Sequence, residues 1–550
     1  MVTAAAVVGR EADAWLLERV VAGESAQGGE IDTALGTLFR KHILEEARPG
    51  RVRFLHDKLR ESAYELIDAG ELRRLHRVVA EVLCTKGCGE SDAAVLARHY
   101  ERAGCVAEAV AFQRQAARHS FGKAALRDAA QHHADALRLI ARLPPSSDRL
   151  TLEVDARLDA FPSYMHLFGP ADDRTVALTR RLVTLADRLG EPNRLARARG
   201  LLSGCHFGRG EMRRCVAVAR SSVHRRRSRR PPIAWLDQSV PLEFRASAAV
   251  ILVIAYFQRG DLQSVDDLAT SLTEELEAEG RVGELLGHPY PPFVAAAAAR
   301  AVSAGVQGRF AEAEHFHRLS LTVAKDTGHK YGQAIAEVIG GCSCYFRGDG
   351  AGAARAGDAA LSIARQAHLA SPQMMGLYTA GIGFVMTGQI AEGVARLEEG
   401  LRIADELGYQ GLRSDAYYGL ALGHLMKRRF AAALSAAEAG LRFSARSGEV
   451  KLVGELQRIA GEALSHGSRP DRERAAALLR QSLAFARAHR MPLTALRTLA
   501  AFARLHRATG RERYARRRQE QVISEARALG LATEEVEALV GASQSTPRSS

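Results

Sequence analysis

The sequence has few aromatic residues and no long apolar stretch. Aromatic side chains make up 6% of the 550 residues, whereas 47% are hydrophobic and alanine is abundant. This composition favours helices packed through small side chains over a sheet protein. A run of about 18 apolar residues, which a membrane-spanning helix needs, is missing. The start, Met1 to Ala4, also lacks a charged leader, so we expect no secretion and a cytoplasmic location.

Cysteine is scarce, and the motifs of metal and nucleotide chemistry are missing. The seven cysteines are scattered, and the close pairs Cys84/Cys88 and Cys342/Cys344 lack the partners that a zinc site requires. We expect them to be buried thiols of a reducing compartment. Neither a Gly-x-x-x-x-Gly-Lys-Ser/Thr phosphate loop nor the kinase sequences His-Arg-Asp and Asp-Phe-Gly occur. The sequence therefore predicts a non-enzyme with no metal, no cofactor and no catalytic residue.

What the sequence does contain is a repeat. Helix-like segments start at four evenly spaced leucines, and a fifth copy follows at nearly the same interval. A turn containing glycine or arginine precedes each of the first four segments. A period this constant is typical of a repeat array. The leucines are Leu321, Leu361, Leu401 and Leu441, followed by Leu483.

One repeat consists of two helices joined by a glycine turn. After Gly388, the apolar residues Ile390, Val394 and Leu397 recur at helical spacing, and the preceding segment 371–387 is apolar with small residues. One such pair is too short to bury its own apolar face, so copies must stack. The pattern resembles the tetratricopeptide repeat in a variant of about 40 residues. We expect an all-α fold, a tetratricopeptide-like right-handed superhelical solenoid.

Residues 1–70 follow a different order. We expect a helix over Ala4–Gly23, a helix over Ile31–His42, a short hairpin and a third helix over His56–Ile67. The hairpin is indicated by two short segments that flank Arg48-Pro49-Gly50. Two helices, a two-stranded wing and a helix make up a winged-helix-like domain.

Four short segments near the N-terminus carry a resemblance to a known family. They resemble the region that follows the ATPase core in large bacterial signalling ATPases of the AAA/STAND type, in which a winged helix and a tetratricopeptide array come next. Members act as transcription regulators or stand behind serine/threonine kinase domains. The P-loop has no counterpart here, so no ATP-binding residue is carried over. The segments are residues 5–11, 54–64, 75–80 and 96–100.

Composition and turns suggest a division of the chain. Leu143-Pro144-Pro145-Ser146-Ser147 is the best candidate for a boundary or hinge. The predicted parts are a winged-helix-like domain (1–70), first helical repeats (71–145), irregular repeats with insert loops (146–300), regular 40-residue repeats (301–490), capping helices (491–540) and a disordered tail (541–550).

Two features are candidates for partner binding. One is an arginine run, which we interpret either as a solvated loop or as a patch for phosphate, nucleic acid or an acidic protein. No aromatic residue interleaves the arginines, which disfavours base stacking. The other is the insert loop 287–292 with its neighbours, since insert loops often mark a binding face. The candidate residues are Arg225, Arg226, Arg227, Arg229, Arg230, Tyr290 and Phe293.

Together these patterns predict a class of function and leave the ligand open. We expect a non-catalytic scaffold in bacterial signal transduction that binds a protein partner or small ligand on its concave face, with no membrane and with nucleic acid disfavoured. One alternative is the C-terminal part of a signalling ATPase or kinase whose catalytic domain lies outside this chain. A second is a DNA-associated regulator.

The last long helix is expected to cap the array. It is polar on most sides because it contains Arg511, Arg513 and Arg516–Arg518, and a terminal repeat needs such a polar outer face.

Overall fold

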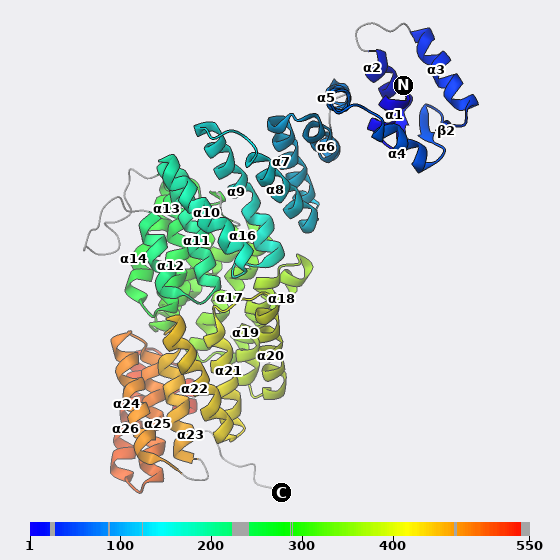
Figure 1. The fold of residues 1–550 in the computed structure, drawn as a ribbon. Coiled ribbons are helices and arrows are strands. Elements are labelled where there is room, and N and C mark those ends of the chain that lie inside the picture. The colour runs from blue at the N-terminus through cyan, green and yellow to red at the C-terminus, as the bar shows by residue number, and fades with distance from the viewer. Residues whose placement is uncertain are drawn as a thin grey trace. The chain divides into compact units, whose positions relative to one another are not determined.

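The computed structural model describes residues 1–22, 28–85, 89–123, 125–222, 241–286, 288, 290–466 and 470–540. These residues form helices and one small sheet near the N-terminus, so the predicted all-α solenoid is confirmed (Figure 1). Internal contacts divide the chain into two compact units. Unit 1 comprises Met1–Leu167 and Thr184–Leu189, and unit 2 comprises Phe168–Val183 and Gly190–Ser550. The predicted division into six parts stays a prediction.

Unit 1 begins with a three-stranded antiparallel sheet packed among four helices. The sheet has the order β1-β3-β2, and Ala12 of β1 and Glu46 of β2 both lie opposite Val52 of β3. The predicted hairpin is confirmed as β2 and β3. The elements are α1 (Val2–Val8), β1 (Glu11–Asp13), α2 (Ala14–Ala22), α3 (Gly28–Arg40), β2 (Leu44–Arg48), β3 (Arg51–Phe54) and α4 (Asp57–Glu65).

The predicted single helix from Ala4 to Gly23 is wrong over its described residues. The chain leaves the helix at Gly9, where φ is 144°, and then forms strand β1. Ala12 is buried in the sheet, and the carboxylate of Asp13 accepts a hydrogen bond of 2.9 Å from Arg51 Nε. Pairing with β3, which lies far along the chain, therefore overrides the local helical pattern. Helix periodicity within one window cannot show such a long-range partner.

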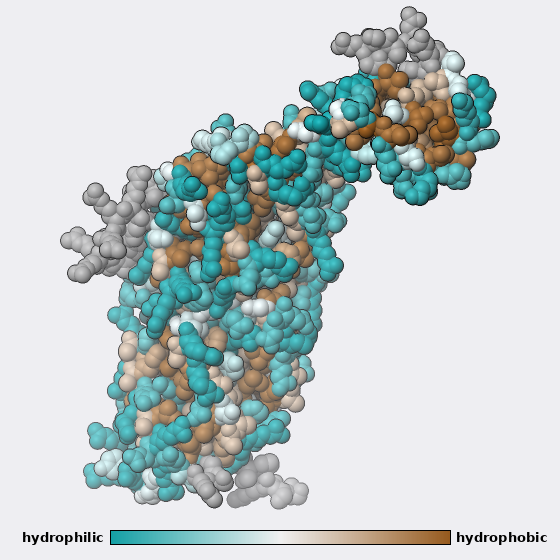
Figure 2. All heavy atoms as spheres, in the orientation of Figure 1, coloured by the Kyte–Doolittle hydropathy of each residue, from teal (hydrophilic) through white to brown (hydrophobic). Residues whose placement is uncertain are grey.

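The surface of this first domain exposes several leucines. Leu55 and Leu59 are 37% and 38% exposed, and Leu66 is 86% exposed. Figure 2 shows hydrophobic residues gathered on the visible face of the domain that α1–α4 form.

The remaining helices of unit 1 are joined to this domain by a hydrogen-bond chain. Arg102 donates to the Tyr64 hydroxyl over 2.7 Å, and that hydroxyl lies 2.8 Å from His76 Nε2. His76 Nδ1 in turn lies 2.9 Å from His99 Nδ1. Burial lowers the pKa of His76 to about 4 and that of His99 to about 3, so both rings are neutral at pH 7. The helices are α5 (Ala69–Thr85), α6 (Ala93–Ala103), α7 (Val106–Gly122), α8 (Leu126–Ile140) and α9 (Ser147–Phe168), with a short 3-10 turn at Glu90–Asp92.

Unit 2 consists of stacked helix pairs. We call the first helix of each pair, the odd-numbered members from α11 to α25, an A helix, and the even-numbered members from α12 to α26 B helices. The bounds are α10 (Asp173–Leu189, shared with unit 1), α11 (Pro192–Gly208), α12 (Met212–Ser222), α13 (Leu242–Gln258), α14 (Leu262–Ala278), α15 (Pro292–Val306), α16 (Phe310–Asp326), α17 (Lys330–Arg347), α18 (Gly350–Gln366), α19 (Ala370–Met386), α20 (Ile390–Glu406), α21 (Arg413–Met426), α22 (Phe430–Ser447), α23 (Val453–His466), α24 (Arg472–Ala488), α25 (Pro492–Ala508), α26 (Glu512–Ala528) and α27 (Thr533–Val540).

The predicted period is confirmed in the regular part of unit 2. The B helices α16, α18, α20 and α22 begin at Phe310, Gly350, Ile390 and Phe430, and these four starts are evenly spaced. Each of the five leucines that define the repeat lies within a B helix. The repeat in the sequence is therefore a repeat of helix pairs.

Small residues set the closest helix contacts, as expected from the segment 371–387. A Cβ built on Gly383 of α19 would lie 2.3 Å from the backbone nitrogen of Ala354 in α18. A Cβ on Gly357 of α18 would lie 2.3 Å from the nitrogen of Ala380. Since real Cβ atoms do not approach backbone this closely, the crossing of α18 and α19 requires glycine at both positions.

Several A helices in the middle and at the end of the array are buried along most of their length. Every residue of α15 except Arg300 is buried, and α19 and α25 are buried along most of their length. A helix in an open single-layer solenoid would keep its concave face in contact with solvent. A helix that is apolar all round is instead one enclosed by protein.

The end of an A helix meets the beginning of a helix five pairs later. Gly208 O at the end of α11 accepts hydrogen bonds from the backbone nitrogens of Gln410 (2.7 Å) and Gly411 (3.1 Å), just before α21. Gln258 O at the end of α13 accepts them from Val450 (2.7 Å) and Lys451 (3.1 Å), just before α23. Arg347 at the end of α17 forms an ion pair with Glu535 of α27. The solenoid thus closes upon itself after five helix pairs, and later A helices cover earlier ones.

Candidate functional site

The segment before α23 carries a buried polar cluster, which we call the Lys451 cluster. Its five members are almost inaccessible to solvent, with Glu449 at 0% and Lys451 at 2% exposure. The Lys451 ammonium donates to Asp415 Oδ1 over 3.0 Å, and the same oxygen accepts a 2.6 Å hydrogen bond from Tyr345. The members are Tyr345, Ser414, Asp415, Glu449 and Lys451.

Glu449 holds the beginning of α21. Its two carboxylate oxygens accept hydrogen bonds from the backbone nitrogen of Leu412 (2.7 Å) and from the Ser414 hydroxyl (2.8 Å). Burial nevertheless raises the pKa of Glu449 to about 7, because these bonds and the nearby Lys451 only partly offset the loss of hydration. The charge of one lysine is therefore shared by two buried carboxyl groups.

Lys451 also joins two turns of the solenoid. Its backbone nitrogen bonds to Gln258 O, and its ammonium group lies 5.1 Å from the centre of the Phe257 ring. Burial acts to lower the pKa of Lys451, but the charges of Asp415 and its other neighbours and the hydrogen bond to Asp415 together outweigh it, so the pKa is raised and the lysine stays charged. The Lys451 cluster fixes α13, α21 and α23 in one arrangement.

A second cluster, the Arg458 cluster, lies between α23 and α25. The Arg458 guanidinium bridges Glu455 (2.7 Å) and Glu462 (2.6 Å), whose side chains are 1% and 11% exposed. Arg497 pairs with Glu455 over 3.0 Å and also donates to Phe346 O over 2.7 Å, which links α25 to α17. Arg504 pairs with Glu462 over 2.8 Å.

The Arg458 cluster has the opposite charge balance. Burial acts to raise the pKa of Glu455, but the adjacent Arg458 and Arg497 outweigh it and lower the pKa to about 2. Three guanidinium groups serve two carboxylates, and each carboxylate has two cationic partners. Arg458 Nε donates to Glu455 Oε2 over 2.8 Å and Arg458 Nη2 lies 2.7 Å from the same oxygen, whereas Glu455 Oε1 accepts from Arg497.

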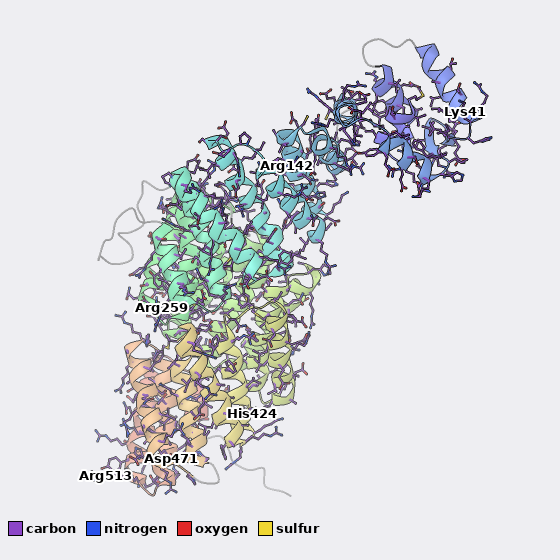
Figure 3. All side chains as sticks on the ribbon, in the orientation of Figure 1. Lys41, Arg142, Arg259, His424, Asp471 and Arg513 are labelled. Atoms are coloured by element: carbon purple, nitrogen blue, oxygen red, sulfur yellow. The ribbon has the colours of Figure 1, made fainter. Side chains whose placement is uncertain are left out.

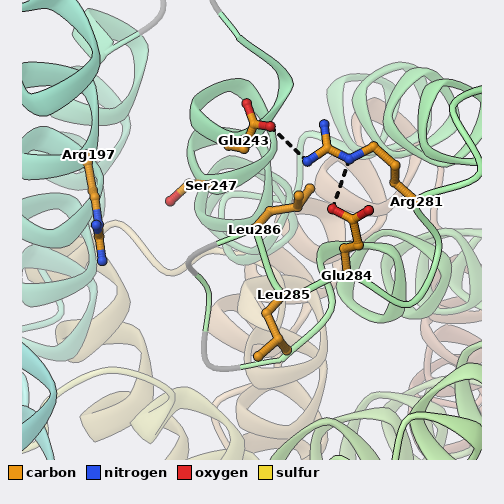
Figure 4. Close-up of a pocket in the computed structure, with 7 residues that line it drawn as sticks. All are labelled: Arg197, Glu243, Ser247, Arg281, Glu284, Leu285 and Leu286. Carbon is orange, nitrogen blue, oxygen red and sulfur yellow. Dashed lines mark hydrogen bonds and ion pairs between the residues drawn. The ribbon is translucent and has the colours of Figure 1, made fainter. Parts of the chain in front are cut away.

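An open pocket of about 440 Å³ lies outside these clusters. Figure 4 shows Arg197 of α11 on one side and the ion-paired Arg281 on the other. Arg281 donates to Glu243 of α13 (2.7 Å) and to Glu284 (2.9 Å), and its hydrogen bond lowers the pKa of Glu243. The lining consists of Arg197, Glu243, Ser247, Arg281, Glu284, Leu285 and Leu286.

The pocket combines a free cation with an apolar wall. Arg197 is exposed and forms no ion pair with any residue that the structure describes. Leu285 is 40% exposed, which is unusual for leucine in this unit. The arrangement is suited to a ligand with an anionic group beside an apolar one.

The predicted partner-binding residues fall in two places. Arg225, Arg226, Arg227, Arg229 and Arg230 lie outside the described residues. Tyr290 and Phe293 are 5% and 1% exposed, and the Tyr290 ring stacks on Tyr331 with 5.4 Å between centroids. Their role in binding stays a prediction.

Sequence reasoning missed the pocket residues, although it singled out the loop beside them. Arg281, Glu284, Leu285 and Leu286 belong to the connection between α14 and α15, which also contains Tyr290. Charged residues in a loop carry no signal of their own. The signal that could have located them is the insert that lengthens the spacing between turns at Gly260 and Gly308.

The residues described contain no helix long and apolar enough to cross a membrane, and no group of three or more His, Cys, Asp or Glu side chains suited to hold a metal ion.

No protein-family model and no curated protein sequence matches the chain. Among solved structures, a Rap protein complexed with Competence and Sporulation Factor is 13% identical, with a TM-score of 0.49 over 71% of this chain and 100% of that one. A signal transduction ATPase of the STAND class with a tetratricopeptide repeat sensor, from Pyrococcus horikoshii, is 11% identical, with a TM-score of 0.30 over 98% of this chain and 65% of that one. The Cut9-Hcn1 hetero-tetramer of APC/C is 12% identical, with a TM-score of 0.43 over 88% and 98%. At these scores the fold assignment rests on this chain's own helix pairs and period.

Proposed function

We propose that the chain is a non-catalytic repeat scaffold of a cytoplasmic signalling system and that it binds a protein segment or small ligand in the pocket between α11, α13 and the α14–α15 connection. The observation that carries the proposal is the exposed, unpaired Arg197 facing a wall that contains Leu285 within the described residues. Since A helices such as α15 and α19 are covered by the chain itself, a ligand on their concave side would have to displace intramolecular contacts. The pocket needs no such displacement.

The Arg281 ion pairs give the pocket a defined shape. Arg281 holds both Glu243 and Glu284, so these three side chains carry one net negative charge, and Arg197 on the opposite side is the cation that has no ion pair within the described residues. A ligand carboxylate would pair with Arg197 and an adjacent apolar group would cover Leu285. A regulatory role follows from the position, because α11 and α13 are the helices whose ends meet α21 and α23.

The winged-helix identity of residues 1–70 is part of the same proposal. The order of helices, strands and hairpin supports it. In this proposal the N-terminal domain conveys ligand binding at the repeats to a further partner.

The test is a peptide selection with the full chain, followed by affinity measurement of the selected peptides by calorimetry. Peptides should share a carboxylate next to an apolar side chain. Arg197→Gln and Leu285→Ser should each weaken binding about tenfold, since each removes one contact of the bound segment. Arg402→Gln, in an exposed ion pair with Glu406 on α20, is the matched control and should bind as the parent does. Equal affinity of the parent and Arg197→Gln would contradict the proposal.

A further inference from the structure

The B helix α26 presents one strongly basic face. Arg513, Arg516 and Arg517 lie three and four positions apart, so their side chains are neighbours on the helix surface, and Arg511 directly precedes the helix. All four are exposed and form no ion pair within the described part of the chain. Like charges at this spacing destabilise a helix, so an anionic partner on this face would relieve their repulsion.

An exposed aromatic ring stands within this cluster. Tyr514 is 59% exposed, which makes it the most exposed aromatic among the large hydrophobic side chains of the described residues. Its ring lies 5.7 Å from that of His506 on α25. The arginine run at 225–230 contains no aromatic residue, whereas here a tyrosine lies between arginines.

The region around this face is itself basic. Residues 470–540 contain fourteen arginines and eight carboxylates, so they contribute six of the thirteen net positive charges. The ten residues that follow contain one arginine and no acid, so the sequence there offers nothing to neutralise the patch. Arg513, labelled in Figure 3, lies on the outer side of the C-terminal helices.

We propose that this face of α26 binds single-stranded nucleic acid. Successive phosphates would pair with Arg513, Arg516 and Arg517, and a base would stack on Tyr514. An acidic protein segment could also pair with the arginines, but an exposed ring among arginines is the combination that binds phosphates and a stacked base together, so we favour nucleic acid. This site is separate from the pocket and does not depend on it.

Fluorescence anisotropy with a labelled oligothymidylate of about 20 nucleotides tests the proposal on the full chain. Binding should weaken steeply with salt. The triple variant Arg513→Gln/Arg516→Gln/Arg517→Gln should lower the slope of log affinity against log salt by about 2, because each phosphate contact on a single strand contributes about 0.7. Tyr514→Ala should weaken binding about fivefold or more with the slope unchanged, and Tyr514→Phe should keep the affinity.

Arg402→Gln is the control for a change of charge elsewhere on the surface and should leave both affinity and slope unchanged. Circular dichroism of each variant shows that the helices are retained, and the Phe variant preserves the ring. The proposal is overturned if the parent does not bind at low salt or if Tyr514→Ala binds as the parent does. It is also overturned if polyglutamate competes at equal charge concentration, since the partner would then be an acidic protein segment.

Discussion

The Lys451 and Arg458 clusters lie one helix pair apart and join the same two turns of the solenoid, yet their charges are balanced in opposite ways. In the Lys451 cluster one cation serves two buried carboxyl groups, and the pKa of Glu449 is raised to about 7. In the Arg458 cluster three cations serve two carboxylates, and the pKa of Glu455 is lowered to about 2. Similar burial thus produces one junction that responds to pH near neutrality and one that does not.

The largest loss of folding stability is expected from Arg458→Met. The substitution leaves Glu455 and Glu462 buried with one arginine each, and removing one partner of a buried ion pair costs about 4 kcal/mol of unfolding free energy. Urea denaturation followed by circular dichroism at neutral pH measures the loss. Arg402→Met, in an exposed pair, is the control and should cost less than about 1 kcal/mol. If the two variants unfold at the same urea concentration, the cluster does not stabilise the junction.

Much of the fold could be predicted from the sequence, because the constant period and the glycine turns are local signals. Phe310, Gly350 and Ile390 begin helices where the repeat places them. The closure of the solenoid on itself after five helix pairs could not be predicted. It depends on the small rotation between successive repeats, which the spacing of residues in the sequence does not encode. The apolar run Ala295–Ala299 in α15 was the visible sign that an A helix is covered on all sides.

The two clusters could not be predicted for a related reason. Gly448-Glu449-Val450-Lys451 is a polar connection between helices, and such connections usually lie on the surface. Only the backbone bonds of Val450 and Lys451 to Gln258, far earlier in the chain, bring Glu449 and Lys451 into the interior. In the candidate site, the α14–α15 connection could be singled out by its length. That Arg197 of α11 lies opposite this connection could be seen only in the folded structure.

A smaller effect, and one that depends on pH, is expected from Lys451→Met. The substitution leaves Asp415 and Glu449 buried without a cation, which should cost about 3 kcal/mol of unfolding free energy above pH 7. As the pH falls through about 7, Glu449 takes up a proton, so the loss should shrink, whereas the loss in Arg458→Met should persist. Urea midpoints over a pH series measure both. The exposed Lys427→Met is the control. If the stability losses of Lys451→Met and Arg458→Met depend on pH to the same extent, the two clusters do not differ in their response to pH.

The sharpest test of the contrast is Glu449→Gln. Because the pKa of Glu449 is raised above the ordinary 4.5 to about 7, the folded state binds its proton more tightly than the unfolded state does. Its stabilising contribution is therefore complete below about pH 4.5 and is lost as the pH rises through about 7. Over that interval the free energy of unfolding of the parent chain should fall by up to about 3 kcal/mol from this group alone, and the glutamine variant should not show this fall.

Glutamine can keep both contacts that hold the start of α21. Its carbonyl oxygen can accept from the Leu412 nitrogen, and its amide can donate to the Ser414 hydroxyl oxygen. The difference in unfolding free energy between variant and parent should therefore shift in favour of the variant between about pH 5 and pH 8. Urea denaturation at both pH values measures that shift. If the difference is the same at both, Glu449 does not titrate in this interval. The Lys451 cluster would then be as insensitive to pH as the Arg458 cluster, because a fixed difference means that folding leaves the proton affinity of the carboxyl group unchanged.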